Sequence, residues 1–172
     1  MSQFYYLHRK RDLIEPAYKI NGMAFPETMD QYLDNPVHLN NQLAFLVGKY
    51  RMKPGNDVTS EDLDSAKEMR IRLNVHPGLT ERFSESVHIF ETITGRRVPN
   101  GEILNLNRNP DRLPLQAISS RTKDRIRELS GLDNALYSFA RDLFMRDVAQ
   151  CGRTRQYTFI DTAKPSVAKD GK

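Results

Sequence analysis

Proline and glycine residues cut this sequence into short segments, and their spacing most limits what the chain can fold into. Nine prolines and nine glycines are spread over 172 residues. Between them, apolar residues recur at intervals of three and four, the period of an amphipathic helix. The stripe is clearest between Gly131 and Gly152. The pattern predicts a mostly helical chain whose best-defined helix lies near its end.

Helix boundaries follow from capping residues and from turn formers. We expect Pro16 to end the segment that follows the first helix, and Asp133 to cap the last helix. One brief strand is expected between Asn74 and Glu81, because a short apolar stretch there is bounded by turn formers. The stretch 96–119 is expected to be irregular. The segments expected to be helical are 2–11, 26–34, 39–47, 59–73, 83–94, 120–129 and 133–151.

Charge and cysteine content narrow the classes of function. The 26 basic and 22 acidic residues give a net charge of +4. The two signs are interleaved, unlike the single-sign surfaces of nucleic-acid binders, so a small anionic ligand is favoured. The single cysteine, Cys151, rules out an internal disulfide and favours a reducing compartment, so we expect a cytoplasmic protein. The longest strongly apolar stretch, 43–47, is too short to cross a bilayer.

The opening residues are unusual for a chain terminus. Ser2 is followed by the cluster Phe4-Tyr5-Tyr6-Leu7 and then by a basic run. A hydroxyl before such an apolar cluster is typical of a buried helix inside a domain, whereas free termini usually fray. We therefore expect that residues belonging to the same domain precede Met1 in a longer protein.

Three segments carry a resemblance to a known family. They are Ser2-Gln3-Phe4-Tyr5-Tyr6-Leu7, Pro77-Gly78-Leu79-Thr80-Glu81-Arg82-Phe83-Ser84-Glu85-Ser86 and Gly131-Leu132-Asp133-Asn134-Ala135-Leu136-Tyr137-Ser138-Phe139-Ala140. In this order and at this spacing, they resemble the carbohydrate sulfotransferases of the heparan-sulfate type and their bacterial relatives. The resemblance covers the chain from Ser2 to about Val148. Its most specific element is the Gly-Leu-Thr-Glu-Arg-Phe run.

The resemblance implies the C-terminal, mostly helical part of a P-loop-like α/β sulfotransferase fold, with one or two short strands. Such enzymes transfer a sulfuryl group from 3′-phosphoadenosine 5′-phosphosulfate to a hydroxyl or amine of a carbohydrate or similar acceptor, and no metal is implied. The family's phosphate loop, its paired Arg and its general base have no counterpart in these residues. The nucleotide-cradling N-terminal half is thus expected to be absent, and this chain alone is expected to be inactive.

The resemblance also implies candidate ligand contacts. Ser2 matches the family's serine that binds the 3′-phosphate of the nucleotide. The stretch 105–110 falls where relatives have a loop that closes over the nucleotide, so Arg108 is expected to pair with phosphate oxygens and Asn107 to bond the base or ribose. No residue is assigned a catalytic role.

An alternative function comes from another class of protein. The chain would then be an independent helical module that grips nucleic acid through residues 120–147, although Arg and Asp alternate there too evenly for a phosphate-tracking stripe. In either case we expect one domain over 1–162 and a disordered basic tail over 163–172. The missing sheet is expected to leave apolar side chains exposed and to drive self-association. Those side chains are Phe4, Tyr5, Leu79, Phe83, Phe90, Leu136, Phe139 and Phe144.

Overall fold

The structure, a computed structural model, describes residues 2–49, 57–99, 102–104, 114–152 and 158–160. Over these residues the chain is mostly helical, as the sequence predicts. Two strands, β1 (Glu102–Leu104) and β2 (Thr158–Ile160), pair in parallel with Ile103 opposite Phe159. The α-helices are α1 (Ser2–Arg9), α2 (Arg11–Ile20), α3 (Met29–Asp34), α4 (Asn41–Leu46), α5 (Ser60–Arg72), α6 (Phe83–Thr94), α7 (Ser120–Leu129) and α8 (Gly131–Cys151). The short 3-10 turns are η1 (Pro36–His38), η2 (Thr80–Arg82) and η4 (Leu115–Ala117).

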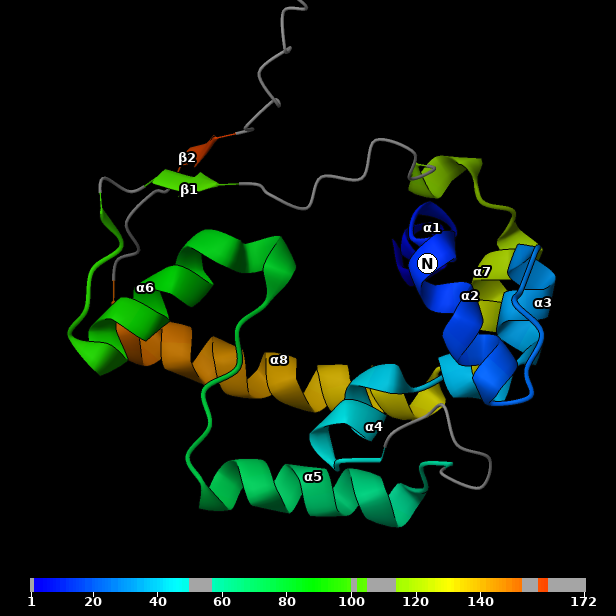
Figure 1. Cartoon of the computed structure of the whole chain (residues 1–172). Helices are drawn as coiled ribbons and strands as arrows, with labels where there is room; N and C mark the ends of the chain where they lie inside the picture. The colour runs from blue at the N-terminus through cyan, green and yellow to red at the C-terminus, as the bar shows by residue number, and fades with distance from the viewer. Residues whose placement is uncertain (1, 50–56, 100–101, 105–113, 153–157, 161–172) are drawn as a thin grey trace, which may run out of the picture.

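Helix α8 is the spine of the molecule (Figure 1). Helices α4 and α5 pack against it on one side, α6 lies along its C-terminal half, and α7 leads into its N-terminal end. Helices α1, α2 and α3 gather beside α7 at that same end. None of the described helices is long and apolar enough to cross a membrane.

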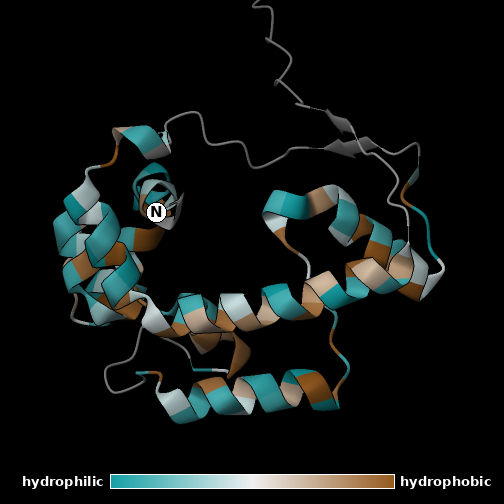
Figure 2. Ribbon diagram, turned by 180° about the vertical axis from the view of Figure 1, so that it is seen from behind, coloured by the Kyte–Doolittle hydropathy of each residue, from teal (hydrophilic) through white to brown (hydrophobic). Residues whose placement is uncertain are grey.

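Three apolar clusters follow one another along this spine. The N-terminal cluster has the buried residues Phe4, Leu7, Tyr18, Phe25, Tyr32 and Leu33, against which α7 packs. The middle cluster has Leu43, Leu63, Ala66 and Leu136 and joins α4 and α5 to α8. The α6–α8 cluster has Leu79, Ile89 and Phe144. Colouring by hydropathy shows apolar and polar residues interspersed along the helices (Figure 2), and several large apolar side chains, among them Leu13 and Ile20, are exposed.

The helix boundaries predicted from local capping residues agree with the structure for several helices. Thr59 begins α5 with a capping box, in which its backbone N–H donates to Asp62 at 2.8 Å and its hydroxyl accepts from the Asp62 N–H. Gly95 ends α6 with a φ of 66°, a left-handed conformation that glycine adopts without strain. Helix α7 has the predicted bounds.

Other boundaries differ from the prediction. Helix α3 begins at Met29 and not at Pro26, because Thr28 and Gln31 form a capping box there. Pro16 lies inside α2 and does not end it. Proline at that position removes one backbone donor and crowds the preceding turn, and the packing of Tyr18 and Ile14 on the N-terminal cluster offsets this cost.

The predicted strand between Asn74 and Glu81 was wrong. Residues 75–79 have no regular structure and lead into η2. A strand needs a neighbour to satisfy its backbone, and here the backbone N–H of Leu79 donates to the Ser86 hydroxyl of α6 at 2.8 Å. In the predicted irregular stretch, residues 102–104 form β1, and 105–113 lie outside the described residues.

The prediction of exposed apolar side chains was wrong for four of the eight residues. Phe4, Leu79, Leu136 and Phe144 are buried, because the helices pack on α8 and on one another. Phe90 is exposed as predicted, with 51% of its surface accessible. The remaining three, Tyr5, Phe83 and Phe139, are partly buried. The tail 163–172 lies outside the described residues.

Candidate functional site

Two of the three segments that carry the family resemblance are in contact. The Tyr137 hydroxyl on α8 donates a hydrogen bond to the Glu81 carboxylate of η2. Leu79 packs against Phe144, and the Arg82 guanidinium lies 5.2 Å from the centre of the Phe144 ring. The most specific run of the sequence is therefore seated on the helix that contains the third segment.

Ser86 shapes the turn that brings this run onto α8. Its hydroxyl accepts from the Leu79 N–H and lies 3.0 Å from the backbone oxygens of Leu79 and Arg82. Gly78 lies so close that a Cβ there would approach the Ser86 Cβ to 3.3 Å. The spacing from Gly78 to Ser86 therefore matches a compact turn that leads directly into α6.

Charged groups around this turn are paired. Arg82 forms an ion pair with Glu85 one turn along α6. The hydrogen bond from Tyr137 lowers the pKa of the Glu81 carboxyl and raises the pKa of the Tyr137 hydroxyl. Farther along α8, His76 Nδ1 lies 3.0 Å from the Asp147 carboxylate. These pairs attach the connection between α5 and α6 to α8 at several points.

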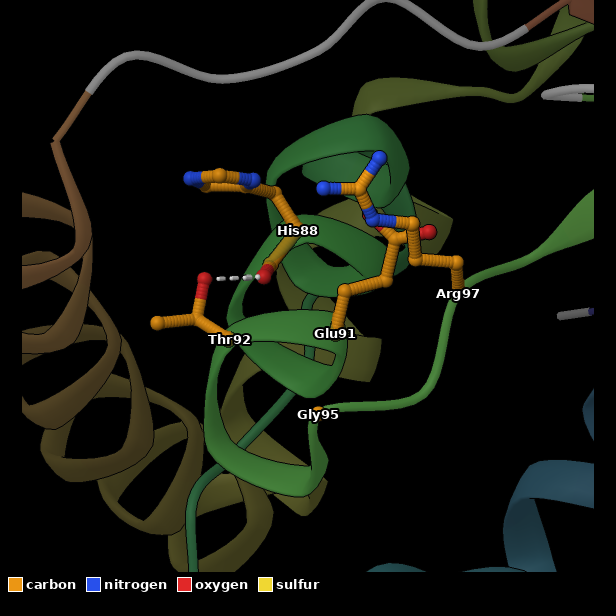
Figure 3. Close-up of a pocket in the computed structure, with 5 residues that line it drawn as sticks. All are labelled: His88, Glu91, Thr92, Gly95 and Arg97. Carbon is orange, nitrogen blue, oxygen red and sulfur yellow. Dashed lines mark hydrogen bonds between the residues drawn. The ribbon is translucent and has the colours of Figure 1, made fainter.

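A polar pocket of about 470 Å³ opens at the C-terminal end of α6. Figure 3 shows the His88 ring and the Arg97 guanidinium on the same side of the helix, with Glu91 beside Arg97. Thr92 and Gly95 complete the lining. Gly95 turns the chain back at the helix end, which brings Arg97 over the last turns of α6.

Hydrogen bonds hold three of the pocket side chains. His88 Nε2 lies 3.2 Å from the Cys151 backbone oxygen at the end of α8. Glu91 accepts from the Val98 N–H at 2.7 Å, and the Thr92 hydroxyl donates to the His88 backbone oxygen at 2.9 Å. No hydrogen bond or ion pair joins the Arg97 side chain to the described residues, so its donors face the pocket. The arrangement can bind an anionic or hydroxyl-rich group.

Ser2, one of the three predicted ligand contacts, does not lie at this pocket. Ser2 begins α1, at the opposite end of α8 from α6 in both views (Figures 1 and 2), and its side chain lies outside the described part. Asn107 and Arg108 also fall outside the described residues. The structure thus joins the second and third resemblance segments, whereas the first begins at the end of α8 opposite to α6. Residues 102–104, which precede the predicted nucleotide-covering loop, form β1.

Sequence reasoning missed the pocket residues. The pair Arg96-Arg97 has the composition of a solvated face, and His88 shows no metal-ligand spacing. The usable signal was Gly95, since a glycine in the left-handed conformation reverses the chain and returns the next residues to the helix. Within the described ranges, no group of three or more His, Cys, Asp or Glu side chains is arranged to hold a metal ion.

Two arginines in the region of the alternative, nucleic-acid-binding function form ion pairs. Arg125 of α7 contacts Asp30 and Asp34 of α3, and Arg127 contacts Asp124. These pairs reduce the positive charge that α7 presents to solvent.

Comparison of the chain with known families, with curated proteins and with solved structures finds no match in any of the three.

Proposed function

We propose that this chain belongs to the carbohydrate sulfotransferase family and forms the helical part of a domain that uses 3′-phosphoadenosine 5′-phosphosulfate. The observation that supports the proposal most is the contact between the Gly78–Ser86 turn and α8 through Glu81 and Tyr137. Two sequence runs chosen for their resemblance, more than fifty residues apart, meet and pack as parts of one scaffold. If the resemblance arose by chance, the two runs would have no reason to lie in contact.

In the proposed reaction the bond between sulfur and the 5′-phosphate oxygen breaks, and a new bond forms between sulfur and the acceptor oxygen or nitrogen. Adenosine 3′,5′-bisphosphate leaves, and the acceptor proton passes to a base. Cations and donors that position the phosphates supply most of the rate enhancement in such transfers. Ser2 is proposed to donate to the 3′-phosphate, Arg108 to pair with phosphate oxygens, and Asn107 to bond the base or ribose.

The acceptor is proposed to be a carbohydrate, and the pocket on α6 to hold part of it. Arg97 and His88 present donors that suit hydroxyl and sulfate oxygens. The chain continues from Arg97 through β1 directly into the proposed nucleotide-covering loop. Only four residues separate Arg97 from β1, so the acceptor contact of Arg97 and the proposed nucleotide contacts of Asn107 and Arg108 would come from one continuous segment.

Nucleotide binding tests the first half of the proposal. By calorimetry, the chain is expected to bind adenosine 3′,5′-bisphosphate in preference to adenosine 2′,5′-bisphosphate and to adenosine 5′-monophosphate. Ser2→Ala and Arg108→Ala should each weaken binding about tenfold, the cost of one hydrogen bond to a phosphate. Ser60→Ala and Arg121→Ala, at exposed positions, are the matched controls. Equal binding of the three nucleotides would refute the proposal.

Acceptor binding tests the second half. A heparan-type oligosaccharide should bind the chain, and Arg97→Ala should weaken that binding about tenfold. Arg96→Ala removes the same charge from an exposed neighbour that does not line the pocket, so it should have a much smaller effect. Equal losses in the two variants would show a diffuse charge effect. Duplex DNA that binds more tightly than the oligosaccharide, with a strong salt dependence, would favour the nucleic-acid module instead.

A further inference from the structure

Arg70 on α5 differs from the other partly buried arginines of the molecule. Its Nε is shielded from solvent and has no hydrogen-bond partner. No ion pair with another described residue involves its guanidinium, and burial lowers its pKa. Three other arginines with a partly buried side chain each have carboxylate partners, namely Arg11 with Glu15 and Glu27, Arg82 with Glu85, and Arg125 with Asp30 and Asp34.

An unpaired, partly buried guanidinium is costly for the folded state. Removing the donor from water without supplying an acceptor destabilises the folded state, and more strongly for a charged group. Buried donors without a partner are rare in folded proteins, and each calls for an explanation. Since no carboxylate among the described residues balances its charge, Arg70 is suited to bind an anion through its remaining guanidinium donors.

The side chain borders a pocket that is open to such an acceptor. The pocket, of about 390 Å³, lies between α4 and α5 and is lined by Asn41, Gln42, Phe45, Leu46 and Arg70. Figure 1 shows the two helices next to each other on the same side of α8. Phe45 is 85% exposed although its helix neighbours Leu43 and Ala44 are completely buried. Phe45 and Arg70 thus line the same pocket.

We propose that this pocket binds the carboxylate of a small apolar organic acid. Arg70 donates hydrogen bonds to the carboxylate oxygens, and the body of the acid packs on Phe45 and Leu46. A single guanidinium matches a carboxylate in charge and in planar geometry, whereas a phosphate dianion needs further cations. The volume suits a small molecule, and the lining is mainly apolar with amide groups from Asn41 and Gln42. This site is separate from the proposed sulfotransferase contacts and does not depend on them.

Comparing a carboxylate with its neutral amide measures the contribution of the ligand's charge to binding separately from that of its apolar body. Calorimetry or chemical-shift titration of the whole chain with 3-phenylpropionate should give saturable binding at millimolar concentration or below. Binding of 3-phenylpropanamide and of inorganic phosphate should each be at least about tenfold weaker, because each lacks one of the two features. No binding of 3-phenylpropionate, or equal binding of the amide, would overturn the proposal.

Two variants locate the binding. Arg70→Met keeps the apolar stem of the side chain and should weaken binding of 3-phenylpropionate at least about tenfold, with Arg72→Met, at an exposed position of the same helix turn, as the matched control. Phe45→Ala changes a side chain that is almost fully exposed, so the fold is retained while binding weakens by several-fold. Unchanged binding in Phe45→Ala, or equal losses in Arg70→Met and Arg72→Met, would refute this location.

Discussion

The N-terminal cluster and the α6–α8 cluster are built in different ways. The N-terminal cluster is aromatic: the rings of Tyr32 and His38 stack with centres 4.1 Å apart, and the Tyr18 hydroxyl lies 3.1 Å from His38 Nε2. Its buried residues all come from positions 4–33. The α6–α8 cluster has three buried residues, and Phe144 lies more than fifty positions after Ile89.

This difference separates local from long-range stabilisation. Contacts among residues 4–33 close short loops, so they form with a small loss of chain entropy. The contact of Leu79 and Ile89 with Phe144 requires α8 to be in place first. The second and third resemblance segments therefore lie in a region that is held together by several contacts between residues far apart in the chain.

Phe144 should be the most sensitive position of the α6–α8 cluster. Phe144→Ala removes a completely buried ring and is expected to lower the free energy of unfolding by about 3–5 kcal/mol. Phe90→Ala deletes the same ring from a half-exposed position of the packed helix and should cost about 1 kcal/mol or less. Urea unfolding followed by circular dichroism measures both. Equal losses would show that the α6–α8 cluster is not a packed core.

Asp133, near the start of α8, caps a helix other than its own. Its carboxylate accepts from the backbone N–H groups of Gln42 and Leu43 in α4, at 3.2 and 2.9 Å. In return, the Asn40 side chain accepts from the Asp133 N–H at 3.0 Å. Asp133→Ala should therefore destabilise the fold by about 1–2 kcal/mol.

The control and the coupling test follow from this reciprocal cap. Asp142→Ala removes a carboxylate from an exposed position of the same helix and should change stability by less than about 0.5 kcal/mol. In a double-mutant cycle, Asn40→Ala and Asp133→Ala should lose less together than the sum of the two single losses. Strict additivity would show that the two caps act independently.

Alkaline pH should weaken the N-terminal cluster. Burial raises the pKa of Tyr18 to about 12 from its ordinary value of 10.0, and also raises the pKa of Tyr32. A raised pKa means that the neutral hydroxyl stabilises the fold below pH 10, and that this stabilisation is lost as the pH rises from about 10 to about 12. Tyr18→Phe should remove its part of the dependence. Tyrosinate absorbance followed with circular dichroism measures it, and ionisation of all tyrosines near pH 10 would contradict it.

The smallest expected effect concerns Glu81 in the α6–α8 region. The Tyr137 hydroxyl lowers the pKa of this exposed carboxyl, so the interaction stabilises the fold above the ordinary pKa of 4.5 and is lost as the pH falls through the lowered value. Tyr137→Phe should return the pKa of Glu81 toward 4.5 with little change in global stability. Carboxyl chemical shifts measure the pKa. An unchanged value in Tyr137→Phe would show that the hydrogen bond does not form in solution.

Features that depend on neighbouring residues were predictable. Thr59 with Asp62, Gly95 and the bounds of α7 all follow from short-range capping and from helical periodicity. The predicted role of Asp133 as the cap of α8 was wrong for the opposite reason. The Asp133 carboxylate accepts from the N-terminus of α4 because that helix lies beside it. The position of α4 cannot be predicted from the residues that neighbour Asp133 in the sequence.

The sequence by itself determined that the chain is mostly helical and where most of its helices stop, because a helix end is set by side chains within one turn of it. The tertiary structure alone decided which faces meet. In that structure Leu79 packs in one cluster with Phe144, and the Asp133 carboxylate caps α4. Arg70 and Phe45 line one pocket, and the Arg70 Nε has no hydrogen-bond partner. The period of an apolar stripe names the face of a helix that will be buried, but the partner depends on contacts between residues far apart in the chain.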